Sequence, residues 1–132
     1  MNKGIGQYKQ IGIETALANA SPHRLIQMLY EGILSQLAIA KGAIANNDHI
    51  RLQESVKKAS IILVGLEEGL DFEKGGEIAV NLEALYQYMQ VELLSAQSAM
   101  SKEKIVAITN LLSELKSGWD AISPDVIESV ES

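Results

Sequence analysis

The double glycine at Gly75 and Gly76 constrains the fold most, because it precedes a long stretch of regularly spaced apolar residues. Adjacent glycines carry a large backbone entropy cost in a helix, so they predict that the preceding helix stops within residues 71–76. From Glu77 onward, apolar residues recur at alternating intervals of three and four, which is the period of one buried helical face. A new helix is therefore predicted to begin at Glu77. Its inward face consists of Ala79, Leu82, Tyr86, Met89, Leu93, Ala96 and Met100.

Three other segments have the same period, and each is preceded by a residue that caps helices well. Ser21 followed by Pro22 predicts a helix that runs to about residue 45, since serine favours the cap position and proline the first helical position. Asp48 and Ser101 predict the starts of two further helices by the same capping rule. Pro124 marks the end of the last of them.

The inward faces of these three helices predict how the chain packs. Every periodic segment repeats at three and four rather than at two, so the sequence predicts an all-α protein, an antiparallel four-helix bundle of residues 21–122. Residues 1–20, broken by glycines, predict a loosely docked N-terminal arm or short extra helix, and residues 123–132 a C-terminal tail. The inward faces are Ile26, Leu29, Ile33, Leu37, Ala40 and Ile44, then Leu52, Val56, Ala59, Leu63, Leu66 and Leu70, and finally Ile105, Ile108, Leu112, Leu115, Trp119 and Ile122.

Composition excludes several classes of function. The chain has 132 residues, enough for one domain, and its net charge of −6 argues against nucleic acid or an anionic membrane as a partner. No apolar run approaches the roughly 18 to 20 residues of a spanning helix, so membrane insertion is not expected. The N-terminus lacks the apolar core of a signal peptide and there is no cysteine, so we expect a cytoplasmic protein.

The chain has few residues that point to catalysis or metal binding. Di-iron bundles need Glu three positions before His, and neither His23 nor His49 has it, so each is expected to be a solvated first-turn residue. A calcium loop beginning at Asp71 would need Glu at its twelfth position, where Leu82 stands. The carboxylates around residues 67–77 are expected to form a solvated turn. We therefore expect no cofactor, no metal site and no enzymatic activity.

Apolar side chains that point away from the inward faces exceed what a monomeric bundle needs. A helix turns by about 100° per residue, and this rotation places these side chains well off the inward face of their own helix. Aligned on neighbouring helices, they predict a patch that the N-terminal arm, a second copy or a partner must cover. Leu25, Met28 and Ile39 flank the first helix similarly, whereas Tyr86 is expected in the core with its hydroxyl reaching solvent. The candidates for partner binding are Ile61, Val64, Val80, Tyr88, Val91, Leu94 and Val106, with Tyr8 and Ile11 from the arm.

Three separated motifs carry a resemblance to a known family. They are Ala20-Ser21-Pro22 with Met28-Leu29-Tyr30-Glu31-Gly32, the stretch LDFEKGGEIAVNLEALYQYM from Leu70 to Met89, and Leu111-Leu112-Ser113-Glu114-Leu115 leading to Trp119. These motifs occur in the order and spacing of the flagellar secretion chaperone family FliS, which the chain resembles from about Tyr8 to Ile122. Tyr8 matches the N-terminal tyrosine of that family.

The resemblance implies a function. It implies a cytoplasmic chaperone that binds the disordered C-terminal segment of flagellin, prevents premature polymerisation and delivers flagellin to the flagellar type III export apparatus. An anti-sigma factor or another flagellar regulator stays open as a further partner. Two other readings also stay open: a structural helical bundle whose outer apolar patch is a self-association interface, and a metal-dependent bundle enzyme, which the missing histidine motif disfavours.

Overall fold

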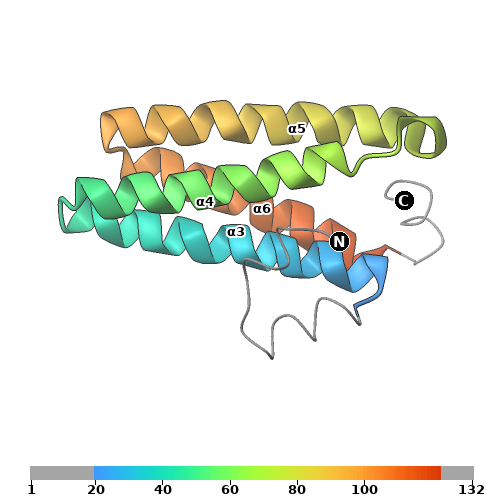
Figure 1. Ribbon diagram of the computed structural model, residues 1–132, viewed down its shortest axis with the longest axis horizontal. Helices are drawn as coiled ribbons and strands as arrows, with labels where there is room; N and C mark the ends of the chain where they lie inside the picture. Colours follow the sequence, from blue (N-terminus) through green and yellow to red (C-terminus); the bar gives the residue numbers. More distant parts are fainter. Residues whose placement is uncertain (1–19, 123–132) are drawn as a thin grey trace.

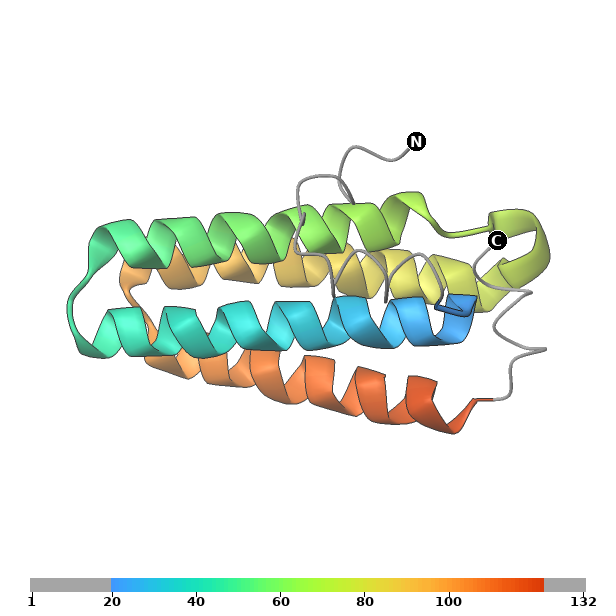
Figure 2. The ribbon, with the colours of Figure 1, turned by 60° about the horizontal axis from the view of Figure 1, so that its bottom comes forward.

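The computed structural model describes residues 20–122, which form four α-helices labelled as in Figure 1. They are α3 (Pro22–Ala45), α4 (His49–Glu68), α5 (Phe72–Ala99) and α6 (Lys102–Ala121). Both α3 and α5 pack against α4 and α6, so the helices form a closed bundle in which α3 and α5 lie diagonally (Figure 1, Figure 2). Successive helices run antiparallel through short turns, which confirms the predicted all-α bundle.

Each helix begins at a side chain that accepts a hydrogen bond from a backbone N–H of its first turn. The predicted caps Ser21, Asp48 and Ser101 all make this contact, at 3.1, 3.0 and 3.2 Å. Such caps satisfy donors that have no partner within the helix, and each contributes about 1 kcal/mol. The predicted starts of α3, α4 and α6 are therefore confirmed.

The start of α5 differs from the prediction. The helix begins at Phe72 rather than at Glu77, because the Asp71 carboxylate accepts a hydrogen bond from the Lys74 N–H at 3.0 Å and caps an extra turn. Gly76 then interrupts the helix with φ 51° and ψ −124°, a conformation that residues with a Cβ rarely adopt. The preceding helix, α4, ends at Glu68 with Gly69 as its C-cap, so the prediction that it stops within residues 71–76 is wrong. Gly76 instead kinks a helix that has already begun.

The core follows the predicted inward faces closely. All six residues predicted for α4 are buried, as are the first six of the seven predicted for α5. Five predicted residues at the helix ends and edges are only partly buried and pack against this core: Leu29, Ile44, Met100, Leu115 and Ile122. Burial of these apolar faces is the main term that holds the bundle together.

Two tyrosines meet in the centre of the core. Tyr30 and Tyr86 are fully buried, and their hydroxyl oxygens lie 2.7 Å apart in a hydrogen bond between α3 and α5. The expectation that the Tyr86 hydroxyl reaches solvent is therefore wrong. Tyr30, which was not assigned to the inward face, lies four residues after Ile26 and three before Ile33, so it fits the period better than Leu29 does.

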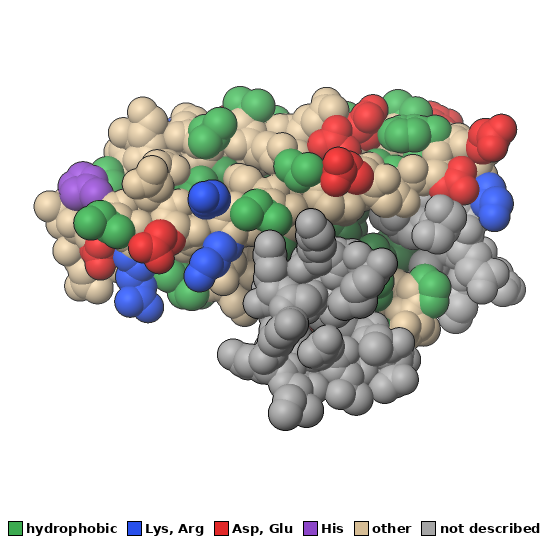
Figure 3. All heavy atoms as spheres, in the orientation of Figure 1, with side chains coloured by type: hydrophobic (Ala, Val, Ile, Leu, Met, Phe, Trp, Pro, Cys, Tyr) green, Lys and Arg blue, Asp and Glu red, His purple; other side chains and the backbone are tan. Residues whose placement is uncertain are grey.

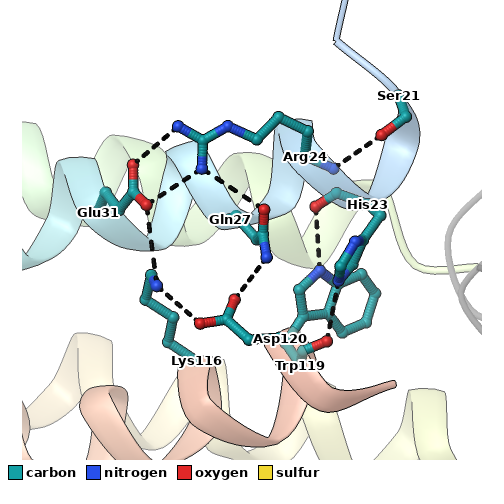
Figure 4. Close-up of polar contacts among 8 residues, drawn as sticks. All are labelled: Ser21, His23, Arg24, Gln27, Glu31, Lys116, Trp119 and Asp120. Atoms are coloured by element: carbon teal, nitrogen blue, oxygen red, sulfur yellow. Dashed lines mark hydrogen bonds and ion pairs between the residues drawn. The ribbon is translucent and has the colours of Figure 1, made fainter. Parts of the chain in front are cut away.

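Polar contacts tie the first turns of α3 to the end of α6 (Figure 4). The His23 Nε2 lies 3.0 Å from the Trp119 carbonyl oxygen, and the Trp119 indole N–H donates to the His23 carbonyl oxygen at 3.2 Å. The Asp120 carboxylate accepts from the Gln27 amide at 2.7 Å and from the Lys116 ammonium at 2.8 Å. His23 is thus half-buried and bonded rather than solvated, whereas His49 is exposed as expected.

Candidate partner-binding surface

A polar contact sets the register between α4 and α5. The Glu67 carboxylate on α4 accepts hydrogen bonds from the side-chain amides of Gln87 and Gln90 on α5, at 2.7 and 3.1 Å. These two helices run antiparallel, so a step backward along α4 corresponds to a step forward along α5. Three or four residues make about one helical turn, and steps of that size keep side chains on the same side.

One helical turn from this contact, exposed apolar side chains of the two helices lie opposite one another. The register pairs Val64 with Val91 and, a turn further on, Ile61 with Leu94. Their exposed fractions are 40% and 63% for the first pair and 58% and 63% for the second. Val80, also exposed, lies eleven residues or about three turns before Val91 on the same side of α5. We call Ile61, Val64, Val80, Val91 and Leu94 the α4–α5 face.

Figure 3 shows apolar side chains exposed along α4 and α5. They point outward because their positions fall between the buried positions of the repeat, about 110° to 170° away from the inward face of their own helix. A set of branched apolar side chains on adjacent helices is typical of a surface that takes the apolar side of another helix.

Other candidates lie elsewhere. Tyr88 is exposed but lies one turn before Glu92, which pairs with Lys104 at 3.8 Å, so it is on the side of α5 toward α6. Val106 is half-buried and lies two residues after Lys104, on the flank of α6 that is turned away from α5. The structure therefore does not join Val106 to the α4–α5 face.

Further predicted residues have different outcomes. Leu25, Met28 and Ile39 are half-buried rather than exposed. Tyr8 and Ile11 lie outside residues 20–122, so their contribution stays a prediction.

Three large exposed apolar residues were not predicted, namely Ile50, Phe72 and Ile78. Ile50 and Phe72 lie in the first turns of α4 and α5, and Ile78 lies two residues after the kink at Gly76. Exposure near a helix start depends on where the neighbouring helices end. The period of the apolar residues contains no information about that.

Within the described bundle, no cluster of three or more metal-ligating side chains occurs. The carboxylates near the α4–α5 turn are exposed or half-buried. Two of them already accept hydrogen bonds, Glu67 from glutamine amides and Asp71 from a backbone N–H. None of the helices in residues 20–122 combines the length and apolar character needed to span a membrane.

Comparison with known proteins links the whole bundle to one family. A family model described as flagellar protein FliS matches residues 4–126. The chain is 43% identical over 121 residues to the flagellar secretion chaperone FliSB of Pseudomonas aeruginosa, covering 92% of this chain and 96% of the relative. It is also 43% identical over 122 residues to the flagellar secretion chaperone FliS of Salmonella typhimurium, with 92% and 90% coverage. Identity to the FliS of Bacillus subtilis is 28% over 112 residues, with 85% and 80% coverage.

Proposed function

Because the chain belongs to the FliS family of flagellar secretion chaperones, we propose that it binds the disordered C-terminal segment of flagellin in the cytoplasm and prevents its premature polymerisation. The observation that supports this most is the α4–α5 face, whose apolar side chains are exposed on two adjacent helices. Flagellin so held is then delivered to the flagellar type III export apparatus.

The face suits an amphipathic segment that becomes helical when it binds. In such a complex, apolar residues of the segment contact the groove at intervals of three and four residues. The contacts would cover the apolar side of the segment, which is then no longer free to join another flagellin. Ordering a disordered segment costs several kcal/mol, which tempers the affinity and favours release at the export apparatus.

A calorimetric titration with a synthetic peptide of the flagellin C-terminal segment tests this function. Ile61→Asp, Val64→Asp and Val91→Asp place a charge where the peptide must exclude water, so each should weaken binding about tenfold or more. Tyr88→Asp is the matched control, because Tyr88 is 54% exposed but lies on the side of α5 toward α6, away from the face. Circular dichroism should show the same helical content in all four variants. Unchanged affinity in the three face variants would contradict the proposed site.

Self-association is the second candidate, since exposed apolar side chains can also pair two copies. Light scattering with and without the flagellin peptide separates the two functions. A chaperone should give a particle of one chaperone and one peptide, whereas an interface between copies should give a dimer whose mass the peptide does not change.

We also propose that residues 1–20, which lie outside the described bundle, cover part of the α4–α5 face in the free protein through Tyr8 and Ile11. A competing arm closes the surface for part of the time, so its removal should tighten peptide binding. If Tyr8 instead contacts flagellin, removal should weaken it. Calorimetry on a chain shortened to begin at Ala20, compared with Tyr8→Ala, separates these cases. Equal affinities in wild type and both variants would exclude any part for the arm.

A further inference from the structure

The charges along α4 change sign from one end of the α4–α5 face to the other. Lys57 and Lys58 lie four and three residues before Ile61, and Glu68 lies four residues after Val64. Residues three or four apart are neighbours on a helix surface, so these side chains flank the apolar residues directly. Along α4 the face therefore runs from basic, through apolar, to acidic.

The charges on α5 reinforce the acidic end. Glu77 is exposed and lies three residues before Val80, and the exposed Glu73 lies four residues before Glu77, across the kink at Gly76. Because α5 runs antiparallel to α4, these carboxylates lie at the same end of the face as Glu68. Figure 3 shows acidic side chains gathered over this end of the two helices together with a basic side chain, and further basic ones nearer the α3–α4 turn. The exposed Lys74 lies at the acidic end and offsets part of its negative charge. Glu54 also lies toward the basic end, so that end carries the weaker net charge.

These charges are available to a partner. Lys57, Lys58, Glu68 and Glu77 are all exposed, and among residues 20–122 none of them takes part in an ion pair. By contrast, charges between α3 and α6 are paired with one another, as in the contact between Lys116 and Asp120. Charged side chains of this kind, which take part in no ion pair in the described part of the chain and lie beside an apolar face, act on any segment that docks there.

Resting on the proposed function, we propose that the gradient sets the direction in which the flagellin segment lies on the α4–α5 face. A helix carries roughly half a positive charge at its N-terminus and half a negative charge at its C-terminus. The favoured direction places the N-terminal end of the bound helix beside Glu68 and Glu77, and its C-terminal end beside Lys57 and Lys58. The segment then runs parallel to α5 and antiparallel to α4.

This direction also specifies the chemistry of the partner. A fitting segment carries an apolar side at intervals of three and four residues, to cover the branched side chains of the face. Near its N-terminal end it lacks carboxylates on the docking side, since these would meet Glu68 and Glu77. A basic side chain there adds an attractive contact with the same carboxylates. Charges of this kind select orientation and partner more than they add affinity.

Cysteine cross-linking measures the direction, because the chain has no cysteine of its own. Val80→Cys and Ser98→Cys place single thiols near the acidic and basic ends, 18 residues or about 27 Å apart along α5. Neither variant alters a charge. The probes are two flagellin C-terminal peptides, one with cysteine before its apolar stretch and one with cysteine after it.

We expect the peptide with the N-terminal cysteine to cross-link to Val80→Cys, and the other peptide to Ser98→Cys, several-fold more than in the swapped combinations. The reverse pattern, or equal yields in all four combinations, would overturn the proposed direction while leaving the function intact. Absence of peptide binding to the wild-type chain in calorimetry would overturn the function itself and this inference with it.

An exchange of charges on α4 tests whether the charge gradient sets the direction of the bound segment. Lys57→Glu combined with Glu68→Lys reverses the α4 gradient without changing net charge, and should weaken peptide binding about three- to tenfold at low salt. The loss should shrink as salt is added, because exposed charges are screened. Lys41→Glu combined with Glu114→Lys is the matched control on α3 and α6, where binding should not change. Equal affinities in the exchange variant and this control would overturn the role of the gradient.

Discussion

At the scale of single residues, one buried hydrogen bond helps to specify how α3 and α5 meet. The Tyr30 and Tyr86 hydroxyls join α3 to α5 in a core that is mostly apolar. A buried hydroxyl is costly unless it is hydrogen-bonded, so this pair favours the one packing that brings the two oxygens together. The sequence predicted that Tyr86 is in the core but not its partner, because periodicity places a residue on a face without saying what lies across from it.

Removal of either tyrosine hydroxyl should lower the free energy of unfolding. Tyr86→Phe takes from Tyr30 the hydrogen bond of 2.7 Å, and should lower the free energy of unfolding by about 1 to 2 kcal/mol. The double variant with Tyr30→Phe should cost less than the sum of the two single variants, since both remove the same contact. Tyr88→Phe is the control, because Tyr88 is exposed. Urea denaturation measures all four, and strict additivity would show that the hydroxyls act independently.

The contact between α3 and α6 should depend on pH through Asp120. Hydrogen bonding to Lys116, and further to Gln27, holds the pKa of Asp120 below its usual value of 3.8. A carboxylate whose pKa is lower in the folded state stabilises the fold above its unfolded pKa, and this stability is lost as pH falls through the folded pKa. Wild type should therefore exceed Asp120→Asn in stability at neutral pH and converge with it in acid. Thermal unfolding between pH 2 and pH 7 measures the difference, and a constant gap across that range would contradict the assignment.

At the scale of helices, caps and apolar period were sufficient to predict most boundaries. The starts of α3, α4 and α6 follow from Ser21, Asp48 and Ser101, whose side chains bond to the first turn as local sequence requires. The start of α5 differs from the prediction because Asp71 caps a turn ahead of the glycines at 75 and 76, where their backbone entropy cost predicts no helix. A capping residue before a glycine pair can begin a helix that the second glycine then kinks.

The inward faces can be tested by cavity formation. Leu82 on α5 and Leu112 on α6 are buried members of the core, so Leu82→Ala and Leu112→Ala should each lower the free energy of unfolding by about 2 to 5 kcal/mol. Ile78→Ala serves as the control on α5, because Ile78 is exposed and its truncation leaves no cavity. Chemical denaturation followed by circular dichroism measures each loss. Losses below about 1 kcal/mol at both core positions would mean that these residues do not pack as assigned.

At the scale of the whole molecule, family membership and fold could be predicted from the sequence, whereas the shape of the outer surface could not. Three motifs in a fixed order identified the family, and the apolar period identified the bundle. The period also showed which side chains leave the inward faces, but only the register between α4 and α5 shows which of them lie together. Val106 and Tyr88 were predicted with the rest because a single helix cannot reveal which neighbour stands beside it.

The most direct test of the central claim is flagellin polymerisation followed by light scattering in the presence of the chaperone. Wild-type protein at equimolar concentration should suppress filament growth, because the bound segment is covered by the α4–α5 face. The combined variant Val64→Asp with Val91→Asp should fail to suppress growth, while Tyr88→Asp, on the side of α5 toward α6, should suppress it as wild type does. Full suppression by the combined variant, with its helical content intact, would contradict the account and assign flagellin binding to another surface.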